Sequence, residues 1–131
     1  MKENGDNVLG IGAELVLRLK ALGEKLRERT APHIGSDTIF IGKVECGEIY
    51  NQATVNCRIE GTRRWVKAGA ETEAKAAIEE LLAELAAACG TRISLVDWNM
   101  PGDAFAVDPD NPLVGAFDSA YQQVTGAQLP R

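Results

Sequence analysis

Two short strand-like runs between two amphipathic helices constrain the fold of this 131-residue chain most strongly. The run 38–46 is rich in β-branched and apolar residues and is bounded by Gly35 and Gly47, which is typical of a strand. Over residues 54–60, apolar and polar side chains alternate with the period of a half-buried strand. Because few residues join the two runs, we expect the strands to pair antiparallel.

Both flanking segments carry the spacing of amphipathic helices. Residues 11–29 place apolar side chains at intervals of three and four, and this helix should end before Pro32. Residues 71–89 show the same stripe, with acidic residues in the first turn and Gly90 suited to the C-cap. The two helices should therefore bury one face each against the strands.

The C-terminal third predicts one more strand and one more helix. Residues 92–98 read as a third strand, which residues 104–107 continue or extend. A last helix should start at Pro112, capped by Asp110 or Asn111, and end at Gly126.

The predicted order is helix, strand, strand, helix, strand, helix. It favours the α+β class: a two-layer sandwich with a small antiparallel, ferredoxin-like sheet, two helices on one face and a C-terminal helix.

Charge and hydropathy exclude two classes of partner. The net charge is −5, from 14 basic and 19 acidic residues, whereas a nucleic-acid binder needs a concentrated basic surface. No stretch approaches the roughly 20 apolar residues that span a bilayer. We therefore expect neither nucleic acid nor a membrane among the partners.

Cysteine usage predicts a reducing compartment. Cys46, Cys57 and Cys89 are odd in number and contain no CxxC pair, so we expect small, apolar-like core thiols. The first residues are polar and lack the apolar segment of a signal peptide. A cytoplasmic location is the resulting expectation.

The residues offer little catalytic chemistry of their own. His33 is the single histidine, so neither a Ser/His/Asp constellation nor a clustered zinc site is available, and we predict no catalytic and no metal-binding residue. The one site-like feature is Asn51 before the second strand, with Arg63 and Arg64 at its end. From the residues alone, the favoured interpretation is that the two arginines are surface cations and that Trp65 packs across a loop.

The stretch GEIYNQATVNCRIEGTRRW, residues 47–65, resembles the dimerization (lid) domain of the zinc-dependent amidohydrolases and carboxypeptidases. That family includes acetylornithine deacetylase, succinyl-diaminopimelate desuccinylase and glutamate carboxypeptidase. The resemblance rests on Gly47, Asn51 and the run 61–64 (Gly-Thr-Arg-Arg), with the asparagine and the last arginine 13 positions apart (64 − 51).

The resemblance implies a fragment of a larger enzyme. Residues 1–108 would be the lid without its first strand, and residues 109–131 the first helix of the returning catalytic domain. Two zinc ions would lie in that catalytic domain, whose ligand motifs are not in this sequence, so the chain by itself should be inactive. Two family features are missing: the histidine of the first strand, and the proline after the asparagine, where Gln52 stands.

Roles for three residues follow from the resemblance. Arg64 would hold the carboxylate of a small substrate bidentately, and Asn51 would assist. Arg63 faces the opposite way on an extended strand and is the less favoured contact. Asn51 and Arg64 are expected to converge at one rim of the sheet. The implied partners are the catalytic domain and a second copy, bound through the sheet edge and helix.

Two other interpretations stay open. The chain could be a freestanding ferredoxin-like module that binds a regulatory ligand, or a catalytically dead paralogue used for scaffolding. Catalytic segments with histidine and aspartate on both sides of the domain in its reading frame would favour the lid.

Overall fold

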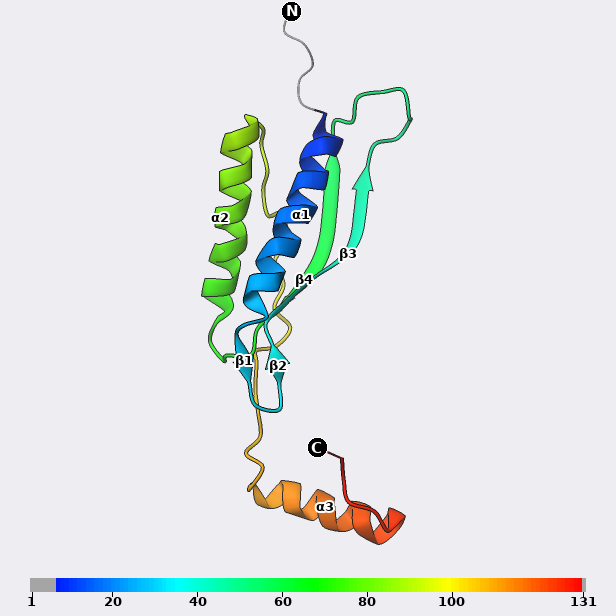
Figure 1. Ribbon diagram of the computed structural model, residues 1–131, viewed down its shortest axis with the longest axis vertical. Coiled ribbons are helices and arrows are strands. Elements are labelled where there is room, and N and C mark those ends of the chain that lie inside the picture. The colour runs from blue at the N-terminus through cyan, green and yellow to red at the C-terminus, as the bar shows by residue number, and fades with distance from the viewer. Residues whose placement is uncertain (1–6, 131) are drawn as a thin grey trace, which may run out of the picture.

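A computed structural model describes residues 7–130 as an α+β protein (Figure 1). The elements in chain order are α1 (Val8–Leu26), β1 (Thr30–Ala31), β2 (Gly35–Ser36), β3 (Thr38–Cys46), β4 (Cys57–Arg64), α2 (Glu71–Cys89) and α3 (Pro112–Thr125). β1 and β2 form a minimal hairpin, and β3 and β4 form a long one. No helix in the described part of the chain is long and apolar enough to cross a membrane.

The β3–β4 hairpin pairs antiparallel, as predicted, from Thr38 opposite Arg64 to Cys46 opposite Cys57. The register shifts between Ile41 and Lys43, which is the signature of a bulge. The strand predicted to begin at residue 54 begins three residues later and extends to Arg64. The predicted start is wrong because residues 54–56 belong to the connecting loop rather than to the ladder.

α1 lies over one face of this hairpin, and α2 lies beside α1 (Figure 1). Leu19 of α1 and Ile78 and Leu82 of α2 form the buried centre of the core. Side chains from both helices, both strands and the segment after α2 surround it: Leu15, Leu22, Ile39, Ile41, Ile59, Leu81, Ile93, Leu95 and Trp98. The predicted apolar stripes therefore meet in one core, since each element buries its apolar face against the others.

The ends of the helices follow local capping signals. α1 begins at Val8 rather than residue 11, because the Asn7 side chain caps it by accepting a hydrogen bond from the Leu9 N–H at 3.2 Å. α2 spans the predicted residues and ends at Gly90 in the left-handed conformation.

The third strand, predicted at 92–98 with 104–107 as its extension, does not form. The described chain contains two separate two-stranded sheets, and neither includes these segments. Residues 91–95 nevertheless alternate between half-buried and exposed, with Ile93 and Leu95 in the core. The segment has the side-chain pattern of a strand without a neighbouring backbone to pair with.

α3 is confirmed in its position, with Asn111 as N-cap, Pro112 in its first turn and Gly126 as C-cap. The Asn111 side chain accepts a hydrogen bond from the Leu113 N–H at 2.9 Å. The helix buries no residue and projects from the end of the molecule (Figure 1), so its apolar residues, such as Phe117, are exposed.

Cys46 and Cys57 form a disulfide across the last rung of the β3–β4 ladder, with their Cα atoms 4.4 Å apart. The prediction of reduced cysteines is therefore wrong for this pair. The strand register brings the two residues directly opposite each other. The spacing of the cysteines along the chain does not predict this proximity. Cys89 is a free, half-buried thiol.

Candidate functional site

The two consecutive arginines at the end of β4 occupy different environments. Arg63 points to the core side, where its Nη2 lies 2.8 Å from Asp37 Oδ2, and the two side chains are 5% and 4% exposed. The other carboxylate oxygen, Asp37 Oδ1, accepts a hydrogen bond from the Val66 N–H at 2.9 Å. Arg63 also donates to the carbonyl of Arg64. Arg63 therefore anchors the strand end and is not free to bind a ligand.

Arg64 lies on the opposite, solvent-facing side of β4, as strand alternation predicts. Its side chain is exposed, and no carboxylate within residues 7–130 forms an ion pair with it. An exposed guanidinium without a protein partner keeps its donors available for an anion.

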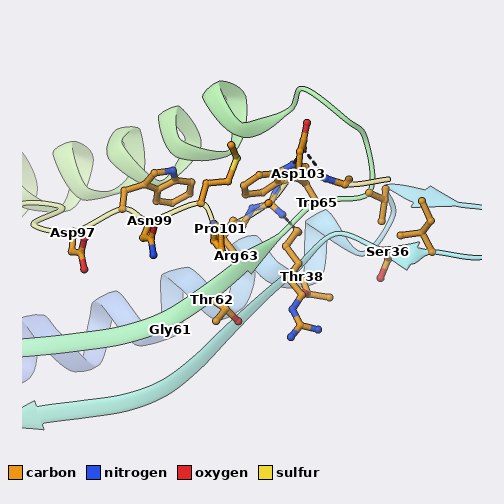
Figure 2. A pocket seen from close by; sticks show the side chains of 17 residues that line it. Ser36, Thr38, Gly61, Thr62, Arg63, Trp65, Asp97, Asn99, Pro101 and Asp103 are labelled. Carbon is orange, nitrogen blue, oxygen red and sulfur yellow. Dashed lines mark hydrogen bonds between the residues drawn. The ribbon is translucent and has the colours of Figure 1, made fainter. Parts of the chain in front are cut away.

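A groove runs beside these arginines, between the end of β4 and the segment after residue 96 (Figure 2). Its volume is about 790 Å³. Gly61, Thr62, Arg63, Arg64 and Trp65 line one wall, and Asp97 through Ala104 line the other. Figure 2 shows that both walls run in the same chain direction. The site therefore opens where the predicted third strand would have joined the sheet.

Two stacked tryptophans fix the walls of the groove to each other. The rings of Trp65 and Trp98 lie parallel within 6°, with centroids 6.4 Å apart. Trp98 Nε1 donates to Glu71 Oε1 at 2.9 Å, which ties the segment to the first turn of α2. This pair was not predicted from the sequence, although these are the chain's two tryptophans and each stands at the end of a strand-like run.

Asp103 closes the end of the groove. Its carboxylate accepts hydrogen bonds from Trp65 Nε1 (2.7 Å), the Gly69 N–H (2.7 Å) and the Ala104 N–H (2.8 Å). The bond from Trp65 and the two backbone bonds favour the charged form, so they lower the pKa of Asp103 below its ordinary 3.8. A carboxylate that is ionised and fully engaged holds the 97–104 segment in place near neutral pH.

Asn51 does not join this site. It lies in the turn of the β3–β4 connection, beyond the Cys57 end of β4, whereas Arg64 is the last residue of that strand. The seven steps of β4 span roughly 23 Å at about 3.3 Å per residue. The predicted convergence of Asn51 and Arg64 within one chain is therefore wrong, because a hairpin carries its turn and its open end at opposite ends of the sheet.

The described residues offer no metal centre. No group of three or more histidine, cysteine, aspartate or glutamate side chains within residues 7–130 is arranged to hold an ion. His33 sits in the β1–β2 turn with a positive φ of 64°. The zinc ions implied by the resemblance find no ligand set here.

Comparison with known proteins gives no neighbour. No protein-family model, no curated protein and no solved structure matches this chain. The structure thus establishes an α+β fold with a groove beside Arg64.

Proposed function

We propose that this chain is the dimerization and substrate-gripping domain of a zinc-dependent amidohydrolase or metallopeptidase that cleaves acyl- or peptidyl-amino acids. In this proposal Arg64 holds the substrate carboxylate and the two zinc ions belong to a separate catalytic domain. The chain alone carries out no chemistry.

The observation that carries the proposal is the contrast between the two arginines. Arg63 is neutralised by Asp37 at 2.8 Å, which leaves Arg64, at the end of β4, as the neighbouring cation for which residues 7–130 supply no carboxylate partner. A guanidinium fork matches a carboxylate in two hydrogen bonds, and the end of a strand restricts how far it can move. Such an arginine suits a substrate with a free carboxylate beside the scissile amide.

A second support is an open position for one more strand. β4 pairs only with β3 in the described chain, so the backbone groups along its other edge have no partner. Across the groove lies the end of the strand-like segment 92–98, whose Ile93, Leu95 and Trp98 pack against the same core. A strand placed between them would run antiparallel to both walls and complete a ferredoxin-like sheet.

The first turns of α1 lie at the end where such a strand would finish. Gly12 lies against the disulfide, which includes Cys57, the first residue of β4. A strand running opposite to β4 would end there and could enter α1 through a short connection. This arrangement agrees with the proposal that a first strand precedes α1 in the full enzyme.

The exposed C-terminal helix is the third support. α3 is a well-capped helix that buries no residue, and its apolar side chains Leu113 and Phe117 are exposed. An amphipathic helix is stable in water mainly when its apolar stripe is covered. A catalytic domain that follows in the chain would cover it.

The test uses the reading frame that contains this domain. We expect catalytic segments with histidine and aspartate on both sides, and the full enzyme should hydrolyse N-acyl-amino acids in the presence of zinc. Arg64→Ala should lower kcat/KM for these substrates by about 10- to 100-fold, since a charge-assisted hydrogen bond contributes about 1.5–3 kcal/mol. Amide substrates without a carboxylate should be affected much less.

Arg58→Ala is the matched control. Arg58 also lies on the solvent-facing side of β4, but near its other end and already in an ion pair with Glu60 at 2.8 Å. Equal effects of the two substitutions, or an unaltered preference for carboxylate-bearing substrates, would refute the role of Arg64. A reading frame without catalytic segments would refute the lid assignment as a whole.

A further inference from the structure

The Cys46–Cys57 disulfide fastens the closed end of the long hairpin. The two cysteines are the last residue of β3 and the first residue of β4, and they face each other in the ladder. Between them runs the connecting loop, residues 47–56. The disulfide therefore converts that loop into a covalently closed ring.

Few other contacts hold this loop. Outside the ladder, its one backbone–backbone hydrogen bond in the described chain runs from the Gln52 N–H to the Ile49 carbonyl at 3.2 Å. Thr54 is its one buried residue, packed beside Gly47. Tyr50 is fully exposed. The loop therefore depends on the covalent bond for much of its order.

The bond also lies against the first helix. Gly12 is buried, and a methyl group at this position would collide with the Cys57 sulfur. Two separate thiols need more room than two bonded sulfurs, because non-bonded atoms stay at van der Waals distance. Reduction should therefore disturb the first turns of α1 as well as the loop.

The other end of the hairpin is fixed by groups that do not change with redox state. There the buried Asp37–Arg63 ion pair and the bond to the Val66 backbone hold the strands. Loss of the disulfide should leave this end, and the core beneath it, intact.

We propose that Cys46 and Cys57 form a reversible redox clasp that fastens the 47–56 loop when oxidised and releases it when reduced. The proposal concerns this chain alone and does not depend on the hydrolase assignment. If that assignment holds, the clasp controls the position of Asn51, which lies in the same loop.

The chemistry is thiol–disulfide exchange with a low-molecular-weight dithiol. A thiolate of the dithiol attacks one half-buried sulfur, the Cys46–Cys57 bond breaks, and the other sulfur leaves as a thiolate that takes up a proton. The second thiol of the reagent then attacks the mixed disulfide and releases the first cysteine. The dithiol is oxidised to its cyclic disulfide, and the protein gains two thiols.

Hydrogen exchange followed by mass spectrometry, with and without dithiothreitol, tests the clasp. On reduction, we expect exchange in residues 47–56 and the first turns of α1 to accelerate by about tenfold to a hundredfold, as the loss of a short covalent loop predicts. Exchange in α2 should stay unchanged. Oxidised glutathione should restore the slow pattern, and differential alkylation should show Cys46 and Cys57 changing state together.

Two variants complete the experiment. The double substitution Cys46→Ser/Cys57→Ser should show fast loop exchange in both buffers, whereas Cys89→Ser should respond to dithiothreitol like the parent chain. The proposal is overturned if the pair stays reduced in oxidised glutathione, or if reduction leaves loop exchange unaltered. It is also overturned if reduction accelerates exchange equally in α2, since that result would mean global unfolding.

Discussion

The buried ion pair at the open end of the hairpin allows a sharp prediction about stability. Asp37→Ala removes the carboxylate that lies 2.8 Å from Arg63 and also accepts the Val66 N–H. The guanidinium would then be left charged in a site where its side chain is only 5% exposed. Removal of one partner of a buried pair costs about 3–5 kcal/mol, because the remaining charge is uncompensated. A domain of this size is stable by only about 5–15 kcal/mol, so the loss should be large.

Urea denaturation followed by tryptophan fluorescence measures this change. Trp65 lies directly after the arginines and stacks on Trp98, so its emission reports on the affected end. The matched control is Glu60→Ala, which breaks the Arg58–Glu60 pair of the same length, 2.8 Å, on the same strand. Those side chains are 64% and 46% exposed, and such pairs contribute about 0–1 kcal/mol.

The two pairs have the same length and each has its arginine on β4, so the main differences are burial and the additional bond from the Val66 N–H to Asp37. A second variant, Arg63→Met with Asp37→Leu, replaces both charges with apolar groups and should recover most of the lost free energy of unfolding. Equal destabilisation by Asp37→Ala and Glu60→Ala would refute the argument. So would a double variant that is less stable than Asp37→Ala.

Two further predictions concern the groove and the assembly. The pKa of Asp103 is lowered in the folded chain, so its stabilisation of the 97–104 segment is present above about pH 3.8 and is lost as the pH falls through the folded-state pKa. Trp65 emission should change in that acid range, and Asp103→Asn should abolish this step. In the proposed enzyme, Asn51 and Arg64 can serve one substrate only from two different subunits. Co-expressed Asn51→Ala and Arg64→Ala subunits should therefore regain about a quarter of the wild-type activity, because about half of the dimers are mixed and each mixed dimer holds one intact site of two. No recovery would show that the two residues do not cooperate across subunits.

Helix caps and side-chain alternation along strands could be predicted from the sequence, because both depend on neighbouring residues. Asn111, Pro112 and Gly126 bracket α3 as capping preferences require, and β3 follows its apolar run. Alternation along β4 correctly separated Arg63 from Arg64, because side-chain direction on a strand is set by position alone.

Features that depend on pairing could not be predicted in this way. Residues 92–98 alternate as a strand should, yet a strand exists only with a partner backbone, and none lies within bonding reach in the described chain. The disulfide follows from the register of β3 against β4, which local patterns do not specify. The prediction that Asn51 lies close to Arg64 was wrong for the same reason, because sequence spacing does not tell which end of a hairpin a residue occupies.

The two ends of the β3–β4 hairpin are held by different interactions, so they should respond differently to reducing conditions. The Arg64 end is fixed by a buried ion pair and by hydrogen bonds to Asp103, which persist at any redox state and at neutral pH. The Asn51 end is fixed chiefly by one disulfide that a thiol can open. A ligand held by Arg64 would thus meet a constant surface on this chain. Anything contributed by the loop that carries Asn51 would instead depend on the oxidation state of Cys46 and Cys57.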